Sequence, residues 1–182
     1  LQAMSTDQVR AFTSDQLQAL STNDVTLLST TQASSLTGVQ VAALTTNQVQ
    51  ALTTSQVTNL TPDQVNSFTT EQIAKLENAD VAALQASQFT TVTADQVQAF
   101  TTSQISQLST AVVAGLTDTQ LGALTTAQLS NMTTTQLDAM SAAKITALSS
   151  PQAGALTTAQ LAHLSTTQVR AIETADLAAL VT

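Results

Sequence analysis

The sequence predicts an all-α solenoid, a superhelix of very short helices with one helix in each eight-residue repeat. Three observations lead to this prediction. Large apolar residues recur at every eighth position from Met4 to Leu180, and no insertion breaks the spacing. Within most repeats, a Ser or Thr and a Gln stand at the separation that starts a helix. A short period kept over a whole chain indicates a repeat array, in which each unit contacts mainly its neighbours.

The repeat is clearest from residue 44 to residue 65, which reads LTTNQVQA, LTTSQVTN and LTPDQV. We call each unit an octad and number its positions one to eight, starting with the large apolar residue. Position two is nearly always Thr or Ser and position five nearly always Gln, as in Thr45 and Gln48. This spacing predicts a capping box, in which the hydroxyl accepts from the N–H of position five and the Gln side chain reaches back to the N–H of position two. A helix should therefore begin at position three of every octad.

Positions one and six are apolar, as in Leu44 and Val49. They fall just before the cap and at the fourth helical residue, where two apolar side chains form a hydrophobic staple. We expect these two positions to face the core and positions three, four and seven to face water. Burial of two such side chains contributes ~1.5–3 kcal/mol each, against an ordering cost of ~1.5 kcal/mol per residue. A single octad therefore cannot fold alone and must stack on its neighbours.

Prolines and charges follow the same repeat. Pro62 falls at the first helical position, where the missing N–H costs nothing. Eleven of the twelve acidic residues lie at positions two to five, and only Asp138 lies outside them. Three of the four basic residues, Arg10, Lys75 and Arg170, lie at positions seven or eight. Acids near helix starts and bases near helix ends are what the helix dipole favours.

Two other folds compete with short helices. A single continuous helix would let an eight-residue pattern drift around its axis, because two turns take about 7.2 residues at ~3.6 residues per turn. A β-solenoid would suit Thr and Val. The capping pattern, the lack of apolar and polar alternation, and the scarcity of Gly for corners favour short helices instead.

The chain reads as one array over residues 1–182, with no linker or shift in composition. Residues 1–3 fit positions six to eight of an octad, and residue 182 fits position three of another. We therefore expect a fragment of a longer array. Its targeting information would then lie outside the fragment, since there is no signal peptide and no apolar stretch near 18 residues.

Composition narrows the partners that the array could have. The formal net charge is −8, which argues against nucleic acid and against anionic membrane surfaces. We therefore expect no nucleic acid and no membrane insertion. The expected contacts are with neighbouring repeats and with other domains of the parent protein, and a protein or glycan partner stays open.

The sequence offers little for catalysis or for cofactors. His163 is the single histidine, and no second group forms a nucleophilic triad with it. We therefore predict no enzyme, no catalytic residue, no cofactor and no dedicated metal site. The best places to look for a weak cation site are the stretches Glu77 to Asp80 and Glu173 to Asp176, which carry an acid at both capping-box positions. For these acids, helix capping is the favoured interpretation.

The pattern L-[TS]-x-x-Q-[VLI]-x-A resembles the tandem octapeptide arrays of very large bacterial exoproteins of the adhesin, haemagglutinin or "haem utilisation or adhesion" type. The likeness spans the whole chain. It implies a structural segment in a surface or secreted protein, whose adhesive function can reside in other domains. The sequence contains no set of haem ligands.

We therefore expect a non-enzymatic structural repeat, a spacer or display scaffold in a large bacterial surface or secreted protein. The first alternative is an adhesion module that binds a protein or glycan through the repetitive surface of the solenoid. The second alternative is an enzyme fragment, which would need a pocket converging on His163 or on Glu77 and Asp80.

Overall fold

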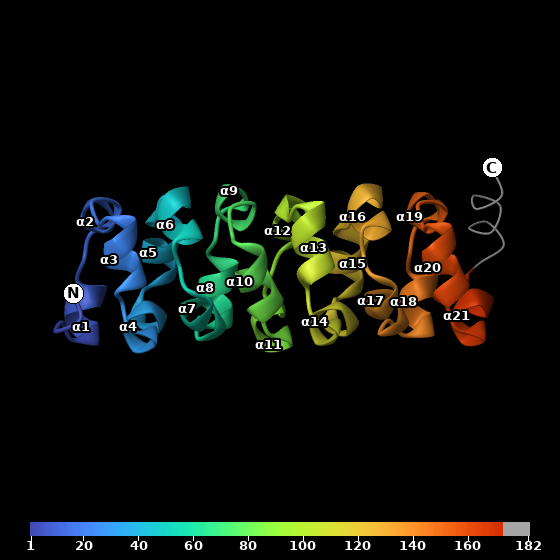
Figure 1. The fold of residues 1–182 in the computed structure, drawn as a ribbon, viewed down its shortest axis with the longest axis horizontal. Coiled ribbons are helices and arrows are strands. Elements are labelled where there is room, and N and C mark those ends of the chain that lie inside the picture. The colour runs from blue at the N-terminus through green and yellow to red at the C-terminus, as the bar shows by residue number, and fades with distance from the viewer. Residues whose placement is uncertain (173–182) are drawn as a thin grey trace.

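A computed structural model of the chain describes residues 1–172. In this part of the chain every element is a helix of four to six residues, and each of the 21 complete octads contains one (Figure 1). The prediction of an all-α solenoid with one short helix per octad is confirmed. The helices are α1 Thr6–Arg10, α2 Ser14–Gln18, α3 Thr22–Thr26, α4 Thr30–Ser35, α5 Gly38–Ala43, α6 Thr46–Gln50, α7 Thr54–Thr58, α8 Pro62–Asn66, α9 Thr70–Ile73, α10 Asn78–Ala83, α11 Ala86–Phe89, α12 Ala94–Ala99, α13 Thr102–Gln107, α14 Thr110–Gly115, α15 Asp118–Ala123, α16 Thr126–Ser130, α17 Thr134–Asp138, α18 Ala142–Thr146, α19 Ser150–Gly154, α20 Thr158–His163 and α21 Thr166–Ala171.

Two extended residues between successive helices explain why each helix is so short. Between α5 and α6, Leu44 has φ −58° and ψ 140°, and Thr45 has φ −68° and ψ 157°. Thr45 accepts from the N–H of Gln48 at 3.2 Å, and its own N–H donates to Gln48 Oε1 at 2.9 Å. This is the predicted capping box, and it starts α6 at position three. Because the next octad repeats the cap, each helix ends after about one turn.

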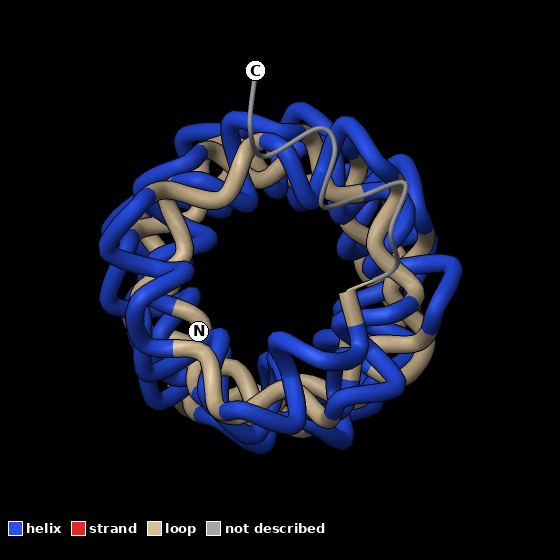
Figure 2. Tube along the Cα trace, turned by 90° about the vertical axis from the view of Figure 1, so that its right-hand side faces the viewer, coloured by secondary structure: helices blue, strands red, loops and turns tan. Residues whose placement is uncertain are grey.

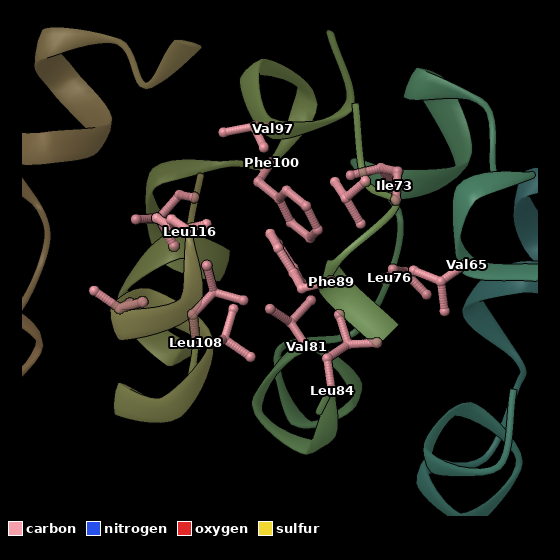
Figure 3. Close-up of a cluster of buried hydrophobic side chains, with 14 of the residues drawn as sticks. Val65, Ile73, Leu76, Val81, Leu84, Phe89, Val97, Phe100, Leu108 and Leu116 are labelled. Carbon is pink, nitrogen blue, oxygen red and sulfur yellow. The ribbon is translucent and has the colours of Figure 1, made fainter. Parts of the chain in front are cut away.

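The core follows the predicted positions. Leu44 and Val49 are 6% and 0% exposed, and positions one and six are buried throughout the interior of the solenoid. Around α10 to α13 these side chains converge from several helices (Figure 3). There the rings of Phe89 and Phe100 stack with centroids 5.7 Å apart. The result is one thin, almost wholly aliphatic core that runs along the chain.

The helices wind into a superhelix. Figure 1 shows successive turns advancing from the N-terminal end to the C-terminal end, and Figure 2 shows them as a ring when viewed along the long axis. Nearly every helix packs against the helix three places further on, as α7 does with α10 and α10 with α13. Within residues 1–172, no helix approaches the length and apolar character needed to cross a membrane.

One predicted cap is wrong. Glu77 occupies the N-cap position of α10, but its side chain makes no capping hydrogen bond. Glu is not among the residues whose short side chains favour this position. Its carboxylate instead accepts from Gln50 Nε2 of the preceding turn at 2.6 Å.

Candidate functional site: the glutamine ladder

The glutamine at position five connects each turn of the solenoid to the turn before it. Gln48 shows the arrangement. Its Oε1 belongs to the capping box with Thr45, while its Nε2 donates to the carbonyl oxygens of Leu17 and Leu20, both at 2.7 Å. Those carbonyls lie 31 and 28 residues earlier in the chain. One amide side chain therefore caps its own helix and ties that helix to the preceding turn.

This bond recurs through the described chain, and we call the whole set the glutamine ladder. In every member, Nε2 donates to the carbonyl 28 residues earlier at 2.6–2.9 Å. Every member is at most 5% exposed. Offsets of 28 to 31 residues, divided by the eight-residue repeat, give 3.5 to 3.9 octads per turn. The members are Gln32, Gln40, Gln48, Gln56, Gln64, Gln72, Gln88, Gln96, Gln104, Gln120, Gln128, Gln136, Gln152, Gln160 and Gln168.

The sequence contained a signal for the ladder that capping alone does not explain. A capping box accepts Glu as readily as Gln at its third helical residue, and the helix dipole favours the acid there. This chain nevertheless has Gln at nearly every position five and Glu at none. The amide is required because it supplies the N–H donor that a carboxylate lacks.

Four described octads have no Gln at position five. Asp24 stands in the first described turn, so no earlier turn faces it within residues 1–172, and its Oδ2 accepts from the N–H of Ser21 at 3.0 Å. The other three are Asp80, Val112 and Lys144, which lie in later turns. Lys144 replaces the amide with an ammonium, and Nζ donates to the carbonyl of Leu116, 28 residues earlier.

Comparison with protein-family models matches the ALTTAQ repeat at residues 1–22, 39–70, 73–110 and 131–166, well over half of the chain. The chain belongs to the ALTTAQ repeat family. The comparison with curated proteins gives no match. The letters ALTTAQ occur unchanged at residues 123–128 and 155–160, where they read from position eight of one octad to position five of the next. Their last letters are the ladder residues Gln128 and Gln160.

Asp80 is the one described position where the ALTTAQ pattern buries a carboxylate. It is 2% exposed, its Oδ1 accepts from Thr54 Oγ1 at 2.8 Å, and its Oδ2 has no partner. The ladder offset pairs this octad with the carbonyl of Leu52, to which no hydrogen bond within residues 1–172 is made. Burial raises the pKa of Asp80 and nearby Glu77 adds to this, while the Thr54 hydroxyl opposes it. An ionised carboxylate, which cannot donate a hydrogen bond, here replaces the ladder amide that would donate to the Leu52 carbonyl.

A shallow cavity of about 340 Å³ lies beside this octad. Gln50, Lys75 and Glu77 line it, together with Asn78 and Ser103. Its polar groups pair with one another across the turns, since Gln50 donates to Glu77 and Asn78 Nδ2 donates to Ser103 Oγ at 2.8 Å. These contacts connect three successive turns of the ALTTAQ array and so act as further ties between them.

The other candidates from the sequence lie apart from this region. His163 is exposed and ends α20, so the structure does not bring it to Glu77 and Asp80. Across residues 1–172 there is no group of three or more His, Cys, Asp or Glu side chains that could hold a metal ion. Glu173 and Asp176 fall outside the described residues.

Proposed function

We propose that this ALTTAQ array is a non-enzymatic structural segment that acts as a spacer or display scaffold in a large bacterial surface or secreted protein. The observation that carries the proposal is the glutamine ladder. In the ladder, the Gln side chain at position five, the most regular polar residue of the repeat, binds successive turns to one another. The resemblance of the octad to repeat arrays in bacterial exoproteins supports the cellular context, and the net charge of −8 suits a segment that stays soluble at high density.

A ladder of this kind favours a rod of adjustable length. Each turn contacts only the turns beside it, so octads can be added or removed without a change in the cross-section. Hydrogen bonds from side chain to backbone resist the sliding of one turn over the next. A spacer needs both properties, namely a length set by repeat number and a shape that does not collapse.

Distance measurements on labelled chains test the proposal. The chain has no Cys, so Asp15→Cys and Thr167→Cys provide two unique exposed sites for a dye pair. Deletion of residues 84–115, which are four complete octads, should shorten the mean distance between the dyes by a fixed step. Deletion of 64 residues should shorten it by twice that step, with equally narrow distributions. A distance that scales with the square root of length, or a broad distribution, would contradict a stiff spacer.

A further inference from the structure

The three non-Gln residues in the later turns follow a spacing of their own. Asp80, Val112 and Lys144 are 32 residues apart, which is four octads, and the next position in this series is Asp176. Because each ladder bond spans 28 to 31 residues, octads that are 32 residues apart lie on successive turns. We call the stack of residues 76–83, 108–115 and 140–147 the seam. All ladder positions of the seam lack Gln, whereas every other later octad up to residue 171 has it.

Each seam residue has a matching partner 26 residues earlier, at position three of an octad in the preceding turn. Asp80 accepts from the hydroxyl of Thr54 at 2.8 Å. Lys144 Nζ lies 3.8 Å from Asp118 Oδ1. Both of these partners are complementary in charge or hydrogen bonding.

Val112 continues the pattern with an apolar partner. The same offset pairs it with Ala86, which has no polar side-chain atom. Val112 is fully buried, and Ala86 lies within reach of the same octad, since its Cβ is 3.9 Å from where a Cβ on Gly115 would stand. The acid and the base therefore each meet a fitting side chain at this offset, and the apolar Val112 stands at the same offset from an apolar residue on the facing octad.

The ladder itself cannot specify which turn stacks on which. Its acceptors are backbone carbonyls, and every octad has the same ones. A chain with Gln at every position five could therefore loop out one octad and restore all later ladder bonds. Near-identical repeats are prone to such misassembly, and buried polar residues are best established as devices that fix register.

We propose that Asp80, Val112 and Lys144 set the register in which successive turns of the solenoid stack. A slip by one octad changes the offset from 26 residues to 34 or to 18. At 34, Lys144 meets Thr110 and Val112 meets the polar Asn78. At 18, Lys144 meets Thr126 and Asp80 meets Pro62, which has no donor. Either slip loses two of the three matches between the seam residues and their partners. The ladder glutamines would make equivalent hydrogen bonds in all three registers, so they do not distinguish one register from another.

Chemical cross-linking measures the register directly. Cysteines in place of Asn78 and Ser103 report the native register, because these side chains are in contact. Cysteines in place of Asn78 and Ala111 report a slip by one octad, because residue 111 occupies the same octad position as residue 103. Each pair is refolded from urea at high dilution and treated with a short bismaleimide. The ratio of native to slipped cross-link is compared between backgrounds.

The triple variant D80Q/V112Q/K144Q gives the seam a Gln at every position five, as in the other stacks of octads. We expect its native-to-slipped ratio to fall roughly tenfold, which corresponds to about 1.4 kcal/mol of lost discrimination. Its melting temperature should hold or rise, since three ladder bonds are added. Asp24→Gln is the matched control, because Asp24 also stands at position five but contacts no earlier turn, and it should leave the ratio unchanged.

A charge exchange tests the same idea without adding ladder bonds. For these variants the cysteines replace Thr110 and Thr135 for the native register, and Thr110 and Ala143 for a slip by one octad, because these pairs span the turns of Asp118 and Lys144 and occupy the same octad positions as the first pairs. Asp118→Lys places two cations together and should lower the ratio, while Asp118→Lys with Lys144→Asp restores an opposite-charge pair and should raise it again. Far-UV circular dichroism establishes that each variant folds. An unchanged ratio in a folded triple variant, or in the charge exchange if the triple variant does not fold, overturns the proposal.

Discussion

The first turn of the solenoid and the later turns use the same octad differently. In the first turn Gln16 is exposed, and its amide only caps, with Oε1 accepting from the N–H of Thr13 at 2.9 Å. In the second turn Gln56 is 1% exposed, makes the same cap with Thr53, and also donates to two carbonyls of the turn before. Local structure is therefore equal in the two regions, and only the contact between turns differs.

The acids at position five show the same contrast. Asp24 in the first turn accepts from the hydroxyl and the N–H of Ser21, and these two hydrogen bonds lower its pKa. Asp80 in a later turn is buried under neighbouring octads, and its pKa is raised. A carboxylate at position five thus favours helix initiation and opposes stacking. The paired positions allow each contribution to be measured separately.

The largest effect is expected from Gln56→Glu. The substitution keeps the capping acceptor but removes the donor to Val25 and Leu28, and it leaves a buried, unpaired charge. Loss of about 3–5 kcal/mol in the free energy of unfolding is expected. Gln16→Glu should be neutral or slightly stabilising, because the acid still caps the helix and has no carbonyl to face. Urea denaturation followed by circular dichroism compares the two, and equal effects would mean that position five only caps.

Gln56→Ala removes both halves of the amide without adding a charge. One capping bond and two inter-turn bonds are lost, which should lower the free energy of unfolding by about 2–3 kcal/mol at ~1 kcal/mol per hydrogen bond. Gln16→Ala loses only the capping bond and should cost about 1 kcal/mol. The difference between the two variants measures the ladder in the same urea titration. A difference near zero would remove the ladder as a source of stability.

Apart from the cap at Glu77, sequence reasoning recovered what depends on neighbours within one octad. The cap at Thr45, the start of α6 and the burial of Leu44 and Val49 follow from residues a few positions apart. The donor bond of Gln48 to Leu20 did not follow, because its partner is set by the number of octads per turn. That number depends on the backbone angles between helices, which the repeat pattern does not specify.

The seam shows how part of this gap could have been closed. The spacing of 32 residues between Asp80, Val112 and Lys144 is visible in the sequence and already suggests about four octads per turn. The wrong cap at Glu77 has a different cause. Treating the acid there as a capping residue ignored the preference for shorter side chains, and the structure uses its length to reach the preceding turn.

Asp80→Asn should stabilise the solenoid at neutral pH by about 1 kcal/mol, since it removes a buried charge and adds an N–H donor. The pKa of Asp80 is raised on folding, so its folded form is favoured by protonation. The contribution of Asp80 to the free energy of unfolding is fully present below its unfolded pKa, near 3.8. It is lost as pH rises through the pKa of the folded state. The gain from Asp80→Asn should therefore grow as pH rises from 3 to 7.

Asp24→Asn should change the stability with the opposite pH dependence. The pKa of Asp24 is lowered on folding, so its contribution is present above the unfolded value and is lost as pH falls. Asparagine at position 24 should therefore weaken the solenoid at neutral pH and make little difference at pH 3. Melting temperatures of both variants across this range check the pair, and parallel pH profiles would contradict the contrast between the two turns.

The smallest difference is expected between Thr53→Ala and Thr13→Ala, and it calibrates the others. Both hydroxyls cap alike, accepting from the N–H of position five at 3.2 and 3.3 Å. Each substitution should cost about 1 kcal/mol. A first turn that frays independently would make every substitution in it look harmless, including Thr13→Ala. Equal losses in urea denaturation would exclude fraying and assign the excess at Gln56 to contacts between turns, whereas a silent Thr13→Ala would assign that excess to position along the chain.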